Sequence, residues 1–151
     1  MDTVNDHEVA FVLAHEYGHL IGRHIEKSQQ QALAGALIVG TLAAVAASNG
    51  DYYDPALVGA GIELGAAAGS HVYSQSYELE SDALGTRITA SAGYDPVKGA
   101  LYFARPEDAR APDGTRSFWG THPPDEKRLA TVIASKKQMD ADVSLQRTSP
   151  Y

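Results

Sequence analysis

Two histidines and a glutamate near the start of the chain form the pattern H-E-x-x-H, as His15, Glu16 and His19. On an α-helix, residues four apart lie about 40° from each other, so both imidazoles share one face. Two imidazoles one turn apart can bind one zinc ion, and the neighbouring glutamate can hold a water molecule as general base. The pattern therefore predicts a hydrolytic zinc site, with one ion per chain and Glu16 as its base.

A catalytic zinc needs a third protein ligand and one open position for water. The best supplier is a second expected helix, in which Glu78 and Asp82 are one turn apart and share a face. If this helix packs across the first, Glu78 can bind the metal. Asp82 can then accept a hydrogen bond from the ring N–H of a ligand histidine and fix its orientation.

Two further histidines compete for the metal. His24 comes one residue too early for the metzincin pattern, whose third histidine would stand at position 25, which is Ile25. On a continuous helix His24 would face away from His15, so we expect a partly exposed helix residue; a metzincin-like protease using His24 is the alternative. His122 precedes two prolines in an expected loop and could serve as a fourth ligand or donate to an oxyanion.

Length and composition restrict the class of protein. A chain of 151 residues corresponds to one domain, so we expect a single catalytic domain over residues 1–151. Twelve Lys and Arg against 19 Asp and Glu give a net charge of −7, which argues against nucleic acid as the main partner. The absence of cysteine excludes disulfides, cysteine zinc sites and thiol catalysis.

The pattern of apolar residues, caps and breakers predicts a mainly α zincin-like domain with little or no β-sheet. The first helix should begin after Asn5, which forms a capping-box pattern with Glu8. We expect Gly93 to end the fourth helix, Asp95 to cap a short fifth one, and the chain after about Asp140 to be frayed. The expected helices run over about 6–30, 32–48, 55–69, 76–92, 96–104 and 124–140, with a loop over 105–124.

The run Ala32–Ser48 contains 17 residues and no charge, which is the lower edge of a membrane span. Two interpretations are open: a hairpin that contacts a membrane, or a helical hairpin buried in protein. We favour the buried hairpin because alanine and glycine are weakly hydrophobic and no basic residue follows Ser48. The chain also starts without a secretory signal pattern, which is expected either of a cytoplasmic protein or of a fragment of a longer precursor.

Three segments together resemble the gluzincin metallopeptidases of the HtpX, BepA and LoiP type, which are related to the CAAX prenyl endopeptidases. The first is H-E-x-x-H at 15–19; the second is E-x-x-x-D-x-x-G, from Glu78 through Asp82 to Gly85; the third is His-Pro at 122–123, followed by Arg128 in the next helix. The family usually carries an edge strand before the H-E-x-x-H helix that pairs with extended substrate. This chain shows no such segment, so we expect a trimmed fragment or a shortened member.

The resemblance implies zinc ligands at His15, His19 and Glu78, with Glu16 as the base. It implies supporting roles for Asp82 and Arg128 around the ligands and places His122 close to the metal, where it could fill the fourth position and inhibit the enzyme. It further implies protein or peptide substrates, such as misfolded envelope or membrane proteins, and a periplasmic or membrane-associated location. A non-catalytic, metal-stabilised binding or chaperone-like domain is the rival interpretation.

Overall fold

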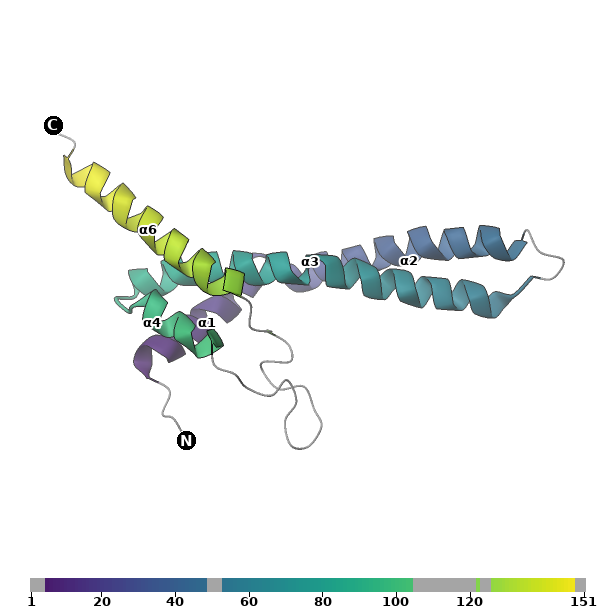
Figure 1. Ribbon diagram of the computed structural model, residues 1–151, viewed down its shortest axis with the longest axis horizontal. Coiled ribbons are helices and arrows are strands. Elements are labelled where there is room, and N and C mark those ends of the chain that lie inside the picture. The colour runs from purple at the N-terminus through teal and green to yellow at the C-terminus, as the bar shows by residue number, and fades with distance from the viewer. Residues whose placement is uncertain (1–4, 49–52, 105–121, 123–125, 149–151) are drawn as a thin grey trace. The chain divides into compact units, whose positions relative to one another are not determined.

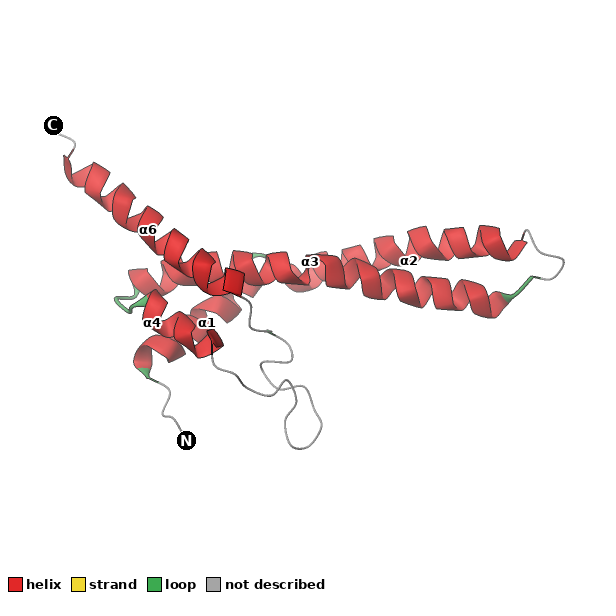
Figure 2. Ribbon diagram, viewed as in Figure 1, coloured by secondary structure: helices red, strands yellow, loops and turns green. Residues whose placement is uncertain are grey.

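The computed structural model describes residues 5–48, 53–104, 122 and 126–148, and every regular element within them is a helix (Figure 2). The mainly α prediction is therefore confirmed. The elements are α1 (Asp6–Ile21), α2 (His24–Ser48), α3 (Pro55–Ser91), α4 (Pro96–Ala100), the short 3₁₀ helix η1 (Leu101–Ala104) and α6 (Glu126–Thr148) (Figure 1). The predicted loop over 105–124 lies outside the described residues, apart from His122.

Local sequence signals fix several helix ends as predicted. The Asn5 side chain accepts from the Glu8 backbone N–H and the Glu8 carboxylate accepts from the Asn5 N–H, which completes the capping box at the start of α1. Gly93, just after α3, has a φ of +86°, the left-handed conformation that ends helices. Asp95 caps α4 by accepting from two backbone N–H groups.

The first helix is shorter than predicted. It ends at Ile21 instead of near residue 30, and a new helix starts at His24. Between them, Arg23 takes a φ of +53°, which no residue inside an α-helix adopts. The predicted boundary between residues 30 and 32 is wrong, because the alanine-rich helix α2 already begins before the glutamine run.

The predicted helices over 55–69 and 76–92 are one helix, α3, of 37 residues. The segment 70–75 between them, which contains two serines, therefore does not interrupt the helix. The expected fraying after Asp140 is also not observed, since α6 stays helical through Thr148.

The chain divides into two compact units, one formed by Met1–Gly22 with Glu78–Tyr151 and the other by Arg23–Tyr77. In the first unit α1, α4, η1 and α6 pack around a small apolar core of Phe11, Ala100, Phe103 and Val132. In the second unit α2 and the first part of α3 form an antiparallel hairpin (Figure 1). The predicted hairpin is confirmed, but the prediction that it is buried is wrong for this chain, because its large apolar side chains are exposed.

Candidate metal centre

The helices that carry the candidate ligands approach each other at two glycines. A Cβ atom on Gly18 of α1 would lie 3.0 Å from the Ser81 Cα of α3, and a Cβ on Gly85 would lie 3.1 Å from the His15 backbone nitrogen. Side chains at either position would force the two backbones apart. This close crossing places one face of α1, with His15 and His19, against the face of α3 that carries Glu78.

Four side chains direct ligand-type atoms into one small volume, and all four atoms lie within 4.8 Å of one another: those of His15, His19, Glu78 and His122. The Nε2 atoms of His15 and His19 are 3.1 Å apart, and a Glu78 oxygen lies 3.4 Å from the first and another 3.2 Å from the second. His122 Nδ1 is 3.3 Å from His15 Nε2 and 3.0 Å from a Glu78 oxygen. The sequence-predicted ligands therefore come together.

These separations fit a tetrahedral metal ion. Ligand atoms about 2.0–2.1 Å from a tetrahedral zinc are separated from each other by roughly 3.3–3.4 Å. The five spacings given above, 3.0–3.4 Å, are close to that edge length, with one Glu78 oxygen near His19 and the other near His15 and His122. Three imidazole nitrogens and one carboxylate also form a donor set that suits zinc.

Asp82 fixes the ring of His15, as the sequence predicts. Its Oδ1 lies 2.9 Å from His15 Nδ1 inside the protein, where both side chains are almost fully buried. Nδ1 therefore carries the ring proton and donates it, which leaves the Nε2 lone pair free to face the cluster. Arg128 Nη2 is 3.4 Å from the same Nδ1, but two donors cannot bond each other, so this is only a contact.

Arg128 binds the other side of Asp82. Its Nε and Nη2 each lie 2.8 Å from an Asp82 oxygen, a bidentate pair that is 3% exposed on the arginine and 1% on the aspartate. A third hydrogen bond runs from Arg128 Nη1 to the backbone carbonyl of His122, and Nη1 also lies 3.3 Å from Glu78. The buried Arg128 guanidinium thus contacts three residues of the centre, namely Asp82, His122 and Glu78.

The protonation of these groups follows from their contacts. Burial alone would lower the pKa of His15, but hydrogen bonds with Asp82 and Glu78 outweigh it and the pKa is raised. Burial alone would raise the pKa of Glu78, yet hydrogen bonds from His122, His15 and His19 hold it well below its usual range. The pKa of Asp82 is likewise lowered against its burial, chiefly by Arg128. Because a metal needs neutral imidazole nitrogens, its binding to this centre would release protons.

His122 lies between the metal position and Glu16. Its Nδ1 belongs to the four-atom cluster, while its Nε2 is 3.3 Å from a Glu16 oxygen. The Glu16 side chain is 45% exposed and is not part of the cluster, as expected of a base that is no ligand. The imidazole therefore occupies the space between the metal position and the candidate base.

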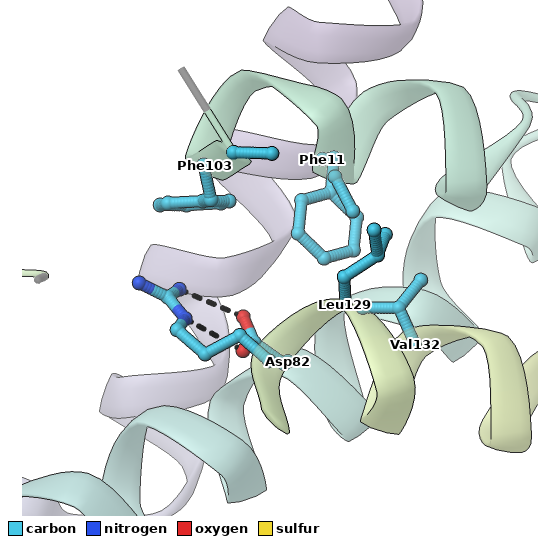
Figure 3. A pocket seen from close by; sticks show the side chains of 8 residues that line it. Phe11, Asp82, Phe103, Leu129 and Val132 are labelled. Carbon is cyan, nitrogen blue, oxygen red and sulfur yellow. Dashed lines mark hydrogen bonds and ion pairs between the residues drawn. The ribbon is translucent and has the colours of Figure 1, made fainter. Parts of the chain in front are cut away.

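Phe103 is a residue of the site that sequence reasoning missed. It is 4% exposed, and its ring centroid lies 5.0 Å from that of His15 and 4.0 Å from the Arg128 guanidinium carbon. Figure 3 shows its ring and that of Phe11 bordering an apolar pocket to which Asp82 also contributes. The aromatic run Tyr102–Phe103 after α4 was the available signal, but nothing in the sequence indicates which ring meets the histidine.

His24 does not take part in the described cluster. It is 4% exposed instead of partly exposed as predicted, because its ring stacks on Tyr77 with centroids 4.5 Å apart. Tyr77 in turn donates to the Gln31 side chain over 2.6 Å. His24 is therefore a packed residue of the hairpin unit, and the described contacts give no support to the metzincin-like alternative.

A helix with H-E-x-x-H that is crossed by a second helix supplying a glutamate is an arrangement typical of metallopeptidases. Comparison with known families agrees: the model of peptidase family M48 matches residues 1–136. The chain belongs to peptidase family M48.

Curated relatives carry names of the same kind. The chain is 29% identical to the beta-barrel assembly-enhancing protease of Yersinia pestis over 91% of its own length, and 28% identical to that of Escherichia coli (strain K12) over 89%. It is 27% identical to the mitochondrial metalloendopeptidase OMA1 of Arabidopsis thaliana over 95% of its length. The chain spans 29%, 28% and 27% of these three relatives, respectively. No solved structure gives a significant match.

Proposed function

We propose that residues 1–151 act as the catalytic region of a zinc-dependent endopeptidase. The observation that carries the proposal is the geometry of the four ligand-type atoms, which are spaced as around a tetrahedral ion, beside an acidic residue that is not one of them. His15, His19 and Glu78 would hold one zinc ion per chain, and Asp82 and Arg128 would orient the ligands.

Zinc in such a centre polarises a carbonyl oxygen and lowers the pKa of water to about 7. The residues of the chain do the rest. Glu16, placed beside the metal position and open to solvent, takes the proton of the attacking water and passes it to the leaving amine. Asp82 keeps the His15 ring in the tautomer that presents Nε2, and Arg128 keeps Asp82 ionised through its two hydrogen bonds.

The position of His122 represents a resting, inhibited arrangement in this proposal. Its imidazole fills the fourth position, where water would have to stand, and engages the base on its other side. Hydrolysis then requires His122 to leave. In the alternative role, His122 would leave this position and donate a hydrogen bond to the oxyanion that forms during hydrolysis.

The proposed substrates are unfolded or misassembled proteins of a bacterial envelope or membrane. This class follows from the names of two relatives, the beta-barrel assembly-enhancing proteases, and from that of the mitochondrial OMA1 metalloendopeptidase. We infer a periplasmic or membrane-associated location on the same grounds.

The test separates metal binding from chemistry. Glu16→Gln should retain one zinc per chain by metal analysis but lose nearly all hydrolysis of casein, because an amide cannot accept the proton. The matched control is Glu80→Gln, which removes a charge of the same type from an exposed position of α3. If Glu16→Gln keeps full activity, or if wild-type protein with zinc cleaves nothing, the catalytic proposal fails and a metal-stabilised binding domain replaces it.

A further inference from the structure

The outer surface of α2 is apolar around its whole free circumference. Its large exposed side chains project in several directions from the helix axis, at 46% or more of their full exposure: Leu33, Leu37, Ile38, Leu42 and Val45. The 18-residue window of this helix with the highest mean hydropathy reaches 1.7, and only 11% of that window is buried. A helix of a water-soluble domain keeps polar residues opposite its buried stripe, and α2 has no such face from Ala32 onward.

Four hydroxyl groups of the hairpin unit donate to backbone carbonyls of their own helix. Thr41 donates to the Leu37 carbonyl over 2.6 Å, and Ser48 donates to Val45 over 2.8 Å. On α3, Ser70 and Ser74 donate to carbonyls three residues earlier in the same way. Hydroxyls that bond to their own helix are the usual solution where no solvent is present to satisfy them.

The two helices of the hairpin pack through glycine. A Cβ atom on Gly35 would collide with the Gly65 carbonyl oxygen, one on Gly65 with the Gly35 carbonyl, and one on Gly69 with the Gln31 carbonyl. Gly61, Gly65 and Gly69 repeat every fourth residue, and each faces α2. Such small-x-x-x-small contacts, with backbones touching and large apolar residues turned outward, are typical of helix pairs in lipid.

The length and charge of the segment match a bilayer. No Asp, Glu, Lys or Arg occurs between Lys27 and Asp51, and the uncharged part of α2, residues 28–48, is about 31 Å long at 1.5 Å per residue. The hydrocarbon layer of a membrane is about 30 Å thick. In the sequence, Arg23, Glu26 and Lys27 precede the uncharged run, and Asp51 and Asp54 follow it. Glu63 is the other charged residue of segment 23–77.

We propose that the α2–α3 hairpin inserts into the hydrocarbon of a lipid bilayer, with acyl chains as the partner of its exposed apolar surface. A second copy or another protein would cover one stripe of α2, whereas the apolar residues surround the free circumference. Glu63 is the one charged side chain of α3 between Pro55 and Tyr77, and it is exposed. Because a carboxylate in hydrocarbon is unfavourable, Glu63 should weaken the binding of the hairpin to the bilayer.

Flotation of the full chain with phosphatidylcholine vesicles tests the proposal, because a neutral lipid excludes attraction by charge. Wild-type protein should float with the vesicles. Ile38→Glu with Leu42→Glu should lower the bound fraction more than tenfold, since each charge in the hydrocarbon is strongly unfavourable. The matched control, Ala130→Glu with Ala134→Glu, places two charges at the same spacing on exposed positions of α6 and should float like wild type.

Two more readouts distinguish the outcomes. Glu63→Gln should raise the partition coefficient between vesicles and water severalfold, measured at a lipid concentration where wild-type protein is only partly bound, because it removes the opposing charge. The chain has no cysteine, so a single introduced cysteine can be labelled specifically. The emission of a polarity-sensitive dye on Val45→Cys should shift to the blue when vesicles are added, while that of the same dye on Ala134→Cys should not. Wild-type protein that stays with the aqueous fraction overturns the proposal, as does a stable oligomer without lipid whose formation Ile38→Glu with Leu42→Glu abolishes.

The flotation result is independent of the proposed peptidase activity. The residues involved lie in Arg23–Tyr77, and the candidate metal centre lies in the other unit. Glu16→Gln protein treated with a chelator should therefore float as wild type does. Loss of hydrolysis with retained flotation would refute only the catalytic proposal, and the reverse result only the membrane proposal.

Discussion

Replacing His122 by alanine is the sharpest test of how the centre works, because its two possible roles predict opposite signs. In the resting arrangement the imidazole contacts Glu78 over 3.0 Å and Glu16 over 3.3 Å. The alanine variant loses both contacts and any bond from Nδ1 to the metal, but it keeps the backbone carbonyl that accepts from Arg128.

The size of the effect follows from these contacts. Hydrogen bonds to charged groups contribute about 1.5–3 kcal/mol each when buried. With zinc bound, Nδ1 would face the ion and could not donate to Glu78, so the hydrogen bond that counts is the one from Nε2 to Glu16. Glu16 is half exposed, so solvent screens this bond and roughly 1–2 kcal/mol remains for the resting arrangement. Since activity scales with the fraction of molecules in which the fourth position is open, His122→Ala should raise kcat/KM by roughly 5–30-fold.

The assay is hydrolysis of labelled casein with zinc at saturation, since loss of a fourth ligand also weakens the metal. His71→Ala, an exposed histidine of α3, is the matched control and should leave the rate unchanged. The double variant Glu16→Gln with His122→Ala should be inactive, which would show that the added activity arises at the same centre. A decrease of roughly 10²–10³-fold in His122→Ala would instead identify an oxyanion donor, and an unchanged rate would contradict both roles.

Two further predictions concern the metal and the helix crossing. Removing the metal with a chelator should lower the midpoint of thermal unfolding by roughly 10 °C, because binding at a thousandfold excess over Kd contributes about 4 kcal/mol; an equal midpoint with and without chelator would show that the cluster binds no metal. Gly85→Ala should lower stability by about 1–3 kcal/mol and weaken zinc binding in a competition assay, since its Cβ would lie 3.1 Å from the His15 nitrogen. Gly59→Ala is the control on the same helix: open space surrounds that position, so the change should be neutral or slightly stabilising.

The candidate site could largely be predicted because its information is local. The spacing of His15 and His19 follows from one helical turn, and so does the spacing of Glu78 and Asp82. A helix that presents two ligands needs a partner helix with a carboxylate, and the sequence offers one. Which atoms meet could not be predicted: the contact of His122 with Glu16 depends on a fold that spans more than a hundred residues.

The helix boundaries were predicted less well, for reasons that the glycines explain. Gly65 and Gly69 indicate a break by their intrinsic propensity, yet they lie inside α3 because their missing side chains let two helices touch. Gly22, by contrast, does stand at a break, since Arg23 after it takes a positive φ. The same residue type signals an end in one place and a contact in another, and only tertiary packing decides between them.

The burial of the hairpin was another limit of sequence reasoning. An uncharged run of alanine, glycine and leucine is equally compatible with a helix buried in protein and with a helix in lipid. The deciding evidence is which side chains face α2's partner and which do not, and here the small residues face inward and the leucines outward. The amino-acid composition includes both the small and the large apolar residues, but it does not show which of them face the partner helix.

The charges of the centre explain why a buried arginine belongs in a site for a cation. Arg128 pairs with Asp82 through two hydrogen bonds, and this pair is neutral as a whole. Of the other two carboxylates, Glu78 faces the metal position and Glu16 lies on the far side of His122. Without Arg128, Asp82 would add a third negative charge behind His15 and would raise the affinity of that ring for a proton, in competition with the metal. The charge of Arg128 lowers the pKa of His15 and so offsets part of the increase that Asp82 and Glu78 cause, which would reduce the competition between a proton and a metal ion for this ring.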